Sequence, residues 1–317
     1  MGVLLDGQWV QETYKRDEAG RFQREESRFR HWVDPEGRFQ PEAGRYHLYV
    51  SLACPWAHRV LIMRHLKGLE PVLSVSVVHP LMLDQGWELR GDFPGATGDP
   101  ILGARYLHEV YTTADPQASG RVTVPALWDC REGTLVNNES RDLLRMLDHR
   151  FEPLAGQDLD LAPPDRVEAV DAAIDALYQS INNGVYRCGF ASSQQAYEEA
   201  ADALYAALDA WETVLAGQRY VCGDQLTEAD ICLYTTLIRF DAVYAVHFKC
   251  SQRLIREYPS LMGYLRELYQ MPAFRATTDF EHIRHHYYRS HPFLNPSGIV
   301  ARMPRLELDA PHGREAL

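Results

Sequence analysis

The pattern of apolar and polar residues divides the chain into a strand-containing first part and a longer helical part. Residues 46–51 (YHLYVS) and 72–78 (VLSVSVV) are rich in aromatic and β-branched side chains, which predicts two strands. Between them, residues 55–67 carry apolar side chains at helical spacing, and Gly68 is a typical helix end. A strand, a helix and a second strand in this order favour a right-handed crossover and a parallel pair.

Four further elements complete this first part. The pattern predicts a helix over 104–113, a strand over 122–128, a strand over 134–137 after a turn, and a helix over 139–149. The resulting order, β-α-β-α-β-β-α, is that of thioredoxin-like domains.

A linker over 152–164 precedes a region in which the apolar spacing is helical almost throughout. Ser192 followed by Gln195 is typical of a capping box and predicts a helix start. Thr227 is the predicted cap of a second helix that runs to about His247. Because that helix is apolar nearly all round, we expect it to be central. Shorter helices are predicted over 254–258, 260–270 and 279–288.

We therefore predict an α/β thioredoxin-like domain over 46–151 and an all-α domain over 165–290. Residues 1–45 are mixed in charge and rich in Gly, Arg and Glu. We interpret them as an N-terminal extension that wraps on the surface, is only partly regular, and gives way to ordered structure at Tyr46. Residues 291–317 contain four prolines and are interpreted as an irregular C-terminal tail.

Composition and charge narrow the function. A length of 317 residues fits two domains, and 46% hydrophobic with 24% charged residues is ordinary for a globular protein. The formal net charge of −12 argues against nucleic acid as a partner. No run approaches the roughly 18 apolar residues of a membrane-spanning helix, and the N-terminus does not resemble a signal peptide. We expect a cytoplasmic protein without a membrane partner.

Cysteine and histidine spacing gives no metal site. The six cysteines are far apart and form no C-x-x-C pair, which argues against a zinc site or a disulfide scaffold and fits a reducing compartment. Most are expected to be small buried hydrophobic residues. Histidines 282, 285, 286 and 291 have a spacing that could place two on one helix face. No carboxylate or cysteine completes a ligand set, so we predict no metal.

Cys54 differs from the other cysteines because it lies at a strand-to-helix turn. Pro55 suits the first position of the helix. The N–H groups and dipole at a helix start stabilise an anion, and a cysteine there can have its pKa lowered from about 8.5 to about 3.5. Arg59, one turn on, can add to the effect. Ala57 stands where dithiol oxidoreductases carry a second cysteine, so an external thiol must release any sulfur group bound to Cys54.

Two further features accompany this cysteine. In this fold order Pro125 is expected to follow a cis peptide bond, which would leave the backbone of Val124 free to pair with a peptide-like ligand. The alternative is an edge-strand proline without a role. Glu139 and Ser140 begin a helix, where a hydroxyl can hold a carboxylate and Glu139 an ammonium; the alternative is a plain N-cap. A thiolate, an exposed strand edge and an amino-acid clamp together predict a glutathione site.

Five segments between about residues 45 and 296 carry a family resemblance. They are SLACPWAHRV, VNNES, INNGVYRCGF, LTEADICLYTTLIRFDAVYAVHFKC and HIRHHYYRSHPFLNP. This set resembles the glutathionyl-hydroquinone reductases, the xi-class glutathione transferases, and N-N-G-V-Y and H-Y-Y-x-S-H are its most specific parts. The resemblance implies a glutathione transferase fold and a homodimer.

The resemblance also implies a reaction in which glutathione, as cosubstrate, reduces a glutathionyl-hydroquinone to the hydroquinone. Cys54 would attack the thioether sulfur, and a second glutathione would cleave the resulting mixed disulfide to release oxidised glutathione. Trp87 would pack on glutathione, the Val124-Pro125 segment would pair with its backbone, and Glu139 and Ser140 would hold its γ-glutamyl end.

Three tyrosines would line the aromatic pocket by the same resemblance: Tyr186, Tyr244 and Tyr287, with Tyr186 and Tyr287 also acting in catalysis. Tyr288 is the adjacent alternative to Tyr287. Spacing alone would assign most of the 17 tyrosines to packing. Two other functions stay open. One is an omega-like thiol transferase or dehydroascorbate reductase, which shares the cysteine but lacks the tyrosine trio. The other is a non-catalytic glutathione-transferase-like binding protein.

Overall fold

The computed structural model describes residues 2–317, and the chain divides into two compact units. Unit 1 comprises the N-terminal residues through Thr13 together with Glu25–Leu159 and Asp279–Ser290. Unit 2 comprises Tyr14–Arg24, Asp160–Thr278 and His291–Leu317. The short segment 14–24 thus belongs to unit 2 although the residues on either side of it belong to unit 1. The segment 279–290 belongs to unit 1 although its neighbours in the sequence belong to unit 2.

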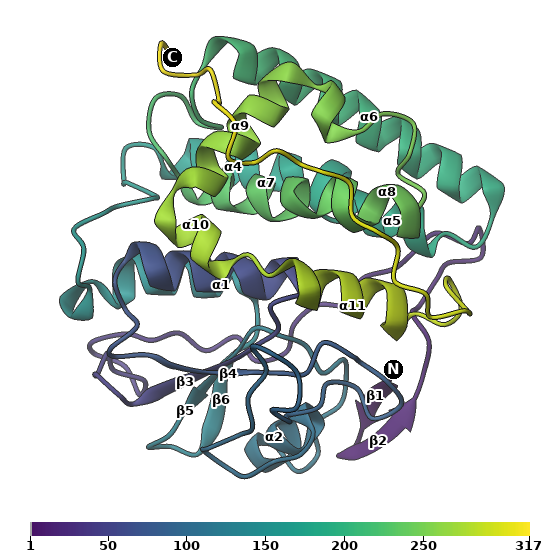
Figure 1. The fold of residues 1–317 in the computed structure, drawn as a ribbon. Coiled ribbons are helices and arrows are strands. Elements are labelled where there is room, and N and C mark those ends of the chain that lie inside the picture. Colours follow the sequence, from purple (N-terminus) through teal and green to yellow (C-terminus); the bar gives the residue numbers. More distant parts are fainter. Residues whose placement is uncertain (1) are drawn as a thin grey trace. The chain divides into compact units, whose positions relative to one another are not determined.

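Unit 1 is built on a four-stranded sheet in the order β4-β3-β5-β6 (Figure 1). Strand β3 pairs in parallel with β4 and antiparallel with β5, and β5 pairs antiparallel with β6. The bounds are β3 Tyr46–Val50, β4 Ser74–Val77, β5 Ala126–Asp129, β6 Thr134–Asn137, α1 Pro55–Leu66, α2 Leu107–Ala114 and α3 Ser140–Arg145. This is the predicted β-α-β-α-β-β-α order, and the thioredoxin-like fold is confirmed.

Several elements of unit 1 are shorter than the sequence predicts, for local reasons. Strand β4 begins at Ser74 because the amides of Val72 and Leu73 both turn back to the carbonyl of Leu69. Strand β5 begins only after Pro125, which has no N–H to donate to a ladder. Helix α3 ends at Arg145 and continues as a π-helical turn over Met146–Arg150.

The N-terminal extension contains a β-hairpin, so the prediction that ordered structure begins at Tyr46 is wrong. Strand β1 (Gly2–Leu5) pairs antiparallel with β2 (Gln8–Gln11) through a two-residue turn. Asp6 and Gly7 in that turn have φ of 48° and 78°, the left-handed region that such hairpin turns require. Leu4 then joins the hairpin to the rest of unit 1 by two backbone hydrogen bonds with Gly120.

Helices make up the regular structure of unit 2 in the described part of the chain. They are α4 Val167–Leu177, α5 Gly184–Phe190, α6 Gln194–Gly217, α7 Glu228–Arg239, α8 Ala245–His247, α9 Pro259–Gln270 and α10 Pro272–Thr277, with π-helical turns at Tyr178–Asn182 and Phe240–Tyr244 and a 3-10 turn at Ile255–Glu257 (Figure 1). The last helix of the chain, α11 (Phe280–Ser290), belongs to unit 1. No helix within residues 2–317 is long and apolar enough to cross a membrane.

Helix α7 is the centre of unit 2, as its apolar sequence predicts: all twelve of its residues are buried. Its start is fixed by Asp230, whose carboxylate accepts hydrogen bonds from the amide and hydroxyl of Thr227 (2.8 and 2.9 Å). Helix α6 is capped one residue later than predicted. The hydroxyl of Ser193, not of Ser192, accepts the amide of Ala196 (3.1 Å).

The C-terminal tail contains no helix or strand among its described residues, as predicted, but it is tied down. Arg314 is 4% exposed, and its guanidinium donates to the carboxylate of Glu267 and to the carbonyl oxygens of Leu215, Gln218 and Arg219. These carbonyls end helix α6, where a cation is favourable. The tail therefore closes the end of that helix.

Candidate active site

Cys54 is the residue that immediately precedes helix α1. Its backbone is extended (φ −76°, ψ 124°), Pro55 is the first helical residue, and the Cys54 carbonyl accepts the first helical amide, that of His58 (2.9 Å). The side chain is half-buried, and all six cysteines of the chain are free of disulfides. The predicted position at a helix N-terminus is confirmed.

The cis-proline segment lies directly beside this cysteine. The Val124–Pro125 peptide bond is cis, as predicted, and the Cys54 thiol lies 3.6 Å from the Val124 carbonyl oxygen. Within residues 2–317 the Val124 amide has no hydrogen-bond partner. Val124, whose carbonyl lies beside the sulfur, therefore has an unpaired backbone donor, as expected for pairing with a peptide-like ligand.

Glu139 and Ser140 occupy the start of helix α3. Glu139 is its N-cap: one carboxylate oxygen accepts the amide of Arg141 (3.2 Å), and Asn137 Oδ1 accepts the Glu139 amide (2.7 Å). Ser140 is 3% exposed, with its hydroxyl 3.4 Å from the same Glu139 oxygen. Glu139 therefore acts as an N-cap in the structure, and binding an ammonium group would be an additional role of the same carboxylate.

Asn138 connects this helix start to the cis-proline segment. Its side-chain amide donates to the hydroxyl of Tyr111 (3.1 Å) and to the hydroxyl of Thr123 (3.2 Å), the residue before Val124. Tyr111 in turn donates to the Thr123 carbonyl (2.7 Å). The structure therefore brings Cys54, Val124, Pro125, Glu139 and Ser140 onto one connected framework.

Trp87 lies in the irregular segment between β4 and α2, so its orientation depends on tertiary contacts. The indole is 6% exposed and stacks on the imidazole of His286 in α11, with ring centroids 4.8 Å apart. His286 Nδ1 lies 2.9 Å from the Pro80 carbonyl oxygen. Because a carbonyl only accepts, Nδ1 is the donor in this bond.

Helix α11 contacts the segment between β4 and α2 at two more points. One of these contacts is made by His282, which we considered as a metal ligand. His282 Nε2 lies 2.7 Å from the Pro94 carbonyl, and the Ser290 hydroxyl accepts the Met82 amide (2.9 Å). The Phe93 ring packs edge-on against His282 and His285, each 5.1 Å away, and burial lowers the pKa of His285. These histidines join α11 to the segment that carries Trp87.

The predicted tyrosines are divided between the two units. Tyr186 and Tyr244 belong to unit 2, with ring centroids 6.0 Å apart, and Tyr244 stacks on Phe248 (5.4 Å). Tyr287 lies in α11 and so in unit 1, where its ring meets that of His286 edge-on (5.2 Å). Tyr288 is also buried, which raises its pKa to about 12. The structure brings Tyr186 and Tyr244 together.

Arg59 lies one turn after Cys54, with its guanidinium over the Trp56 ring (4.3 Å to the centroid). It is 2% exposed. Arg59, which we predicted to support the thiolate, is therefore buried and packs on Trp56.

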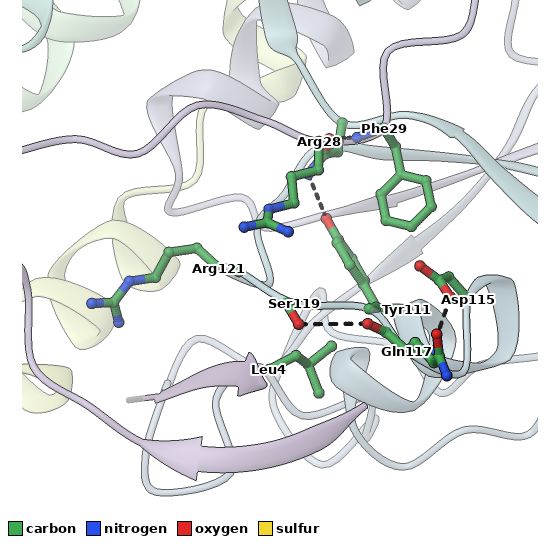
Figure 2. Close-up of a pocket in the computed structure, with 11 residues that line it drawn as sticks. Leu4, Arg28, Phe29, Tyr111, Asp115, Gln117, Ser119 and Arg121 are labelled. Carbon is green, nitrogen blue, oxygen red and sulfur yellow. Dashed lines mark hydrogen bonds between the residues drawn. The ribbon is translucent and has the colours of Figure 1, made fainter. Parts of the chain in front are cut away.

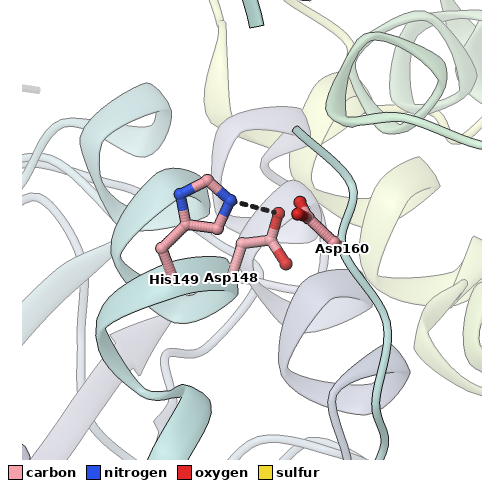
Figure 3. A group of neighbouring side chains, drawn as sticks. All are labelled: Asp148, His149 and Asp160. Atoms are coloured by element: carbon pink, nitrogen blue, oxygen red, sulfur yellow. Dashed lines mark ion pairs between the residues drawn. The ribbon is translucent and has the colours of Figure 1, made fainter. Parts of the chain in front are cut away.

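Acidic and histidine side chains that could suit a metal are engaged in other bonds. Figure 3 shows Asp148, His149 and Asp160. Asp148 forms an ion pair with Lys67 (3.1 Å), both almost fully buried, and lies 3.5 Å from His149. Asp160, in unit 2, accepts the amide of Ala162 (3.0 Å).

A cavity of about 150 Å³ lies in unit 1 beside the N-terminal extension (Figure 2). Its lining includes Arg28, Phe29, Tyr111, Ser119 and Arg121, and it contains none of the predicted site residues. The Tyr111 hydroxyl donates to the Thr123 carbonyl (2.7 Å), and the Ser119 hydroxyl donates to the Asp6 carboxylate (3.3 Å). It marks where the extension meets α2.

Two neighbours of the site were not predicted from the sequence. His286 was considered only as a metal ligand, although its place beside Tyr287 was a signal that it could lie near the site. Ser27, in the extension, donates a hydrogen bond to Glu139 (3.0 Å), and no local sequence pattern indicates it.

Family models match both parts of the chain. Residues 53–150 match the glutathione S-transferase N-terminal domain, and residues 194–267 match the glutathione S-transferase C-terminal domain. The matched ranges contain Cys54 and helices α6 and α7 respectively.

Similar proteins cover the whole chain. The glutathionyl-hydroquinone reductase YqjG of Escherichia coli K12 is 50% identical over 99% of both chains, and PcpF of Sphingobium chlorophenolicum, also named a glutathionyl-hydroquinone reductase, is 47% identical over 95% of both. A xi-class glutathione transferase from Natrialba magadii matches with a TM-score of 0.94 and 50% identity, covering 100% of this chain and 97% of its own. The glutathione-bound structure of YqjG matches with a TM-score of 0.92, 48% identity and 99% coverage of both chains.

Proposed function

Since the chain belongs to the glutathionyl-hydroquinone reductases, glutathione transferases of the xi class, we propose that Cys54 is the nucleophile with which it reduces glutathionyl-hydroquinones to hydroquinones. Glutathione is the reductant and leaves as its disulfide. The observation that carries the assignment is the position of Cys54: at the start of α1, and 3.6 Å from the Val124 carbonyl beside the cis-proline.

In the first step the Cys54 thiolate attacks the thioether sulfur of the substrate. A sulfur–sulfur bond forms, the bond from sulfur to the ring carbon breaks, and that carbon takes up a proton. The products are a Cys54–glutathione disulfide and the free hydroquinone. Placement at a helix start favours the thiolate, which is the reactive form.

In the second step the thiolate of another glutathione attacks the glutathione sulfur of this disulfide. Oxidised glutathione leaves and the Cys54 thiolate is restored, so electrons and atoms balance over the cycle. Ala57 occupies the position where a resolving cysteine would stand, so the Cys54-Pro55-Trp56-Ala57 motif itself has no second thiol for this task. The requirement for an external thiol follows from that residue.

Glutathione would be held by the framework around Cys54. The free Val124 amide would pair with the glutathione backbone beside Pro125, and Trp87 would pack on the tripeptide. The Glu139 carboxylate would accept the α-ammonium group, and the Ser140 hydroxyl would donate to the α-carboxylate. Asn138 and Thr123, the residues that precede Glu139 and Val124, are hydrogen-bonded to each other (3.2 Å), which sets the spacing of the two contacts.

Tyr186, Tyr244 and Tyr287 would bind the hydroquinone. Loss of sulfur requires a ring carbon to gain a proton, which is easiest through the keto tautomer. Hydroxyl donors aimed at the ring oxygen would stabilise that tautomer or the anion that precedes carbon protonation. We further propose that the protein is cytoplasmic and forms a homodimer; size-exclusion chromatography with light scattering would check the dimer.

Turnover of glutathionyl-benzohydroquinone and glutathionyl-menadione, with Cys54→Ala as the matched variant, tests the function. We expect hydroquinone release from the wild type and none above background from a folded Cys54→Ala. Oxidised glutathione should label Cys54 in preference to the exposed Cys130, whose pKa is raised by surrounding protein and by Asp129 and Asp99. Wild-type turnover by Cys54→Ala would contradict the mechanism, and glutathione binding without any turnover would favour a binding protein.

A further inference from the structure

Part of the N-terminal extension runs along the end of strand β6 as an additional paired segment. Phe29 and Asn138 are joined by two hydrogen bonds: the Asn138 amide donates to the Phe29 carbonyl (3.0 Å), and the Phe29 amide donates to Asn138 Oδ1 (3.1 Å). Two residues after Phe29, the His31 amide donates to the Val136 carbonyl (2.9 Å). The extension is therefore placed next to the residues that precede Glu139.

Ser27 uses this placement to reach Glu139. Its hydroxyl lies 3.0 Å from Glu139 Oε2 and 3.2 Å from the Asn138 carbonyl oxygen. Both partners only accept, so the Ser27 hydroxyl is the donor. The other carboxylate oxygen, Oε1, accepts the Arg141 amide (3.2 Å). Donors on both oxygens therefore fix the plane of the Glu139 carboxylate.

The extension is anchored by the residues that directly follow Ser27. The Phe29 ring meets Tyr111 edge-on (5.5 Å, 87°), and Figure 2 shows the two side chains next to each other. Arg30 binds Asp142 of α3 through two nitrogens, with Nη2 2.9 Å from Oδ1. Asp142 also accepts the side-chain amide of Asn137 (3.0 Å). These contacts fix the segment that places Ser27 beside Glu139.

We propose that Ser27 is a positioning residue for recognition of the α-ammonium group of glutathione, which it serves by holding the Glu139 carboxylate in a fixed orientation. This rests on the proposed function, which assigns that ammonium to Glu139. A carboxylate held by two donors keeps its remaining lone pairs aimed in one direction, so less orientational freedom is lost when the ammonium binds. The N-terminal extension then contributes directly to selectivity for the γ-glutamyl end.

The experiment compares Ser27→Ala with wild type using two thiols. One is glutathione, and the other is glutaryl-cysteinylglycine, which has the same skeleton without the α-amino group. We expect Ser27→Ala to raise the Kd of glutathione for the resting enzyme by about 2- to 10-fold, the range of one hydrogen bond, and to leave the Kd of the desamino thiol unchanged. Ser27→Thr, which keeps the hydroxyl, should restore most of the affinity.

Ser119→Ala is the matched control, because its hydroxyl also bonds a carboxylate of unit 1, that of Asp6 (3.3 Å). It should leave both thiols unaffected. Equal losses with both thiols, or no loss with glutathione, would overturn the role of Ser27. If Glu139 does not bind the α-ammonium group, Glu139→Gln should discriminate between the two thiols as well as wild type does. That result would overturn the proposed function of Glu139 and the role of Ser27 with it.

Discussion

The imidazole of His286 stacks on the indole of Trp87 with the ring planes 22° apart. Both rings are at least nine-tenths buried, and His286 is also tied to the Pro80 carbonyl. Trp87 has no helix or strand of its own to orient it. The next residue in α11 is Tyr287, so one helix both supports the indole proposed to contact glutathione and carries a tyrosine proposed to contact the hydroquinone.

Replacing His286 by Leu should therefore raise KM for glutathione while kcat changes little. An aromatic pair contributes about 0.5–1.5 kcal/mol beyond area burial, which corresponds to about a 2- to 12-fold change. His286→Phe, which keeps a ring but not the hydrogen bond to Pro80, should retain most of the affinity. Steady-state kinetics with varied glutathione measures both variants. Equal KM values for His286→Leu and wild type would show that the stack does not set the position of Trp87.

Phe variants of Tyr186, Tyr244 and Tyr287 should lower kcat and barely change glutathione affinity. Loss of one donor to a developing anion costs on the order of 10–1000-fold in rate, with the lower end expected where three donors share one oxygen. Tyr288→Phe is the matched control in α11. If Tyr288→Phe loses kcat and Tyr287→Phe does not, the assignment passes to Tyr288. Full kcat in all three variants would remove the tyrosines from the mechanism.

The order of elements in unit 1 and the position of Cys54 could be predicted because their causes are local. β-branched runs, Pro55 at a helix start and the proline before β5 each act within a few residues. The hairpin of the extension also has a local signal, since Asp6-Gly7 between two apolar runs is typical of a tight turn, although the mixed charge of residues 1–45 obscures it. The boundaries given above for the two domains, 46–151 and 165–290, stay predictions.

Contacts between distant residues could not be predicted in the same way. Ser27 and Glu139 are 112 residues apart, and His286 meets Trp87 only because α11 returns to the first unit. Neither pair has a local pattern that specifies it.

Stability should depend on pH through His47. The ring is 1% exposed between the hydroxyls of Ser74 and Ser76 (2.7 and 2.9 Å), and burial, with a smaller contribution from Arg64, lowers its pKa to about 4, against the opposing charge of Asp99. A lowered histidine pKa means that the neutral form is favoured on folding. The contribution is therefore complete above the unfolded pKa of about 6.5 and is lost as pH falls towards 4.

Between pH 7 and pH 5 the wild type should lose about 2 kcal/mol more of its free energy of unfolding than His47→Gln, which keeps hydrogen-bonding groups but does not titrate. Urea unfolding of both proteins at the two pH values measures the difference. The comparison removes the contributions of other histidines, which both proteins share. Parallel losses in the two proteins would show that His47 is not buried in its neutral form.

The last prediction concerns Arg314, which holds the C-terminal tail on unit 2. Arg314→Met keeps the aliphatic stem but leaves the carbonyls of Leu215, Gln218 and Arg219 without their buried donor. Glu267 retains Arg219 (2.6 Å), so its charge stays paired and the cost should be about 2–4 kcal/mol, not the larger cost of an isolated buried ion.

Arg305→Met, an exposed arginine in the same tail, is the control and should change stability by less than about 0.5 kcal/mol. Guanidinium chloride unfolding measures both variants, and hydrogen exchange reports where the loss occurs. Because Arg314 bonds the carbonyls at the end of α6, exchange in Arg314→Met should increase first in the last turn of that helix. An unchanged midpoint, or faster exchange confined to the tail, would mean that the tail covers the helix end without stabilising it.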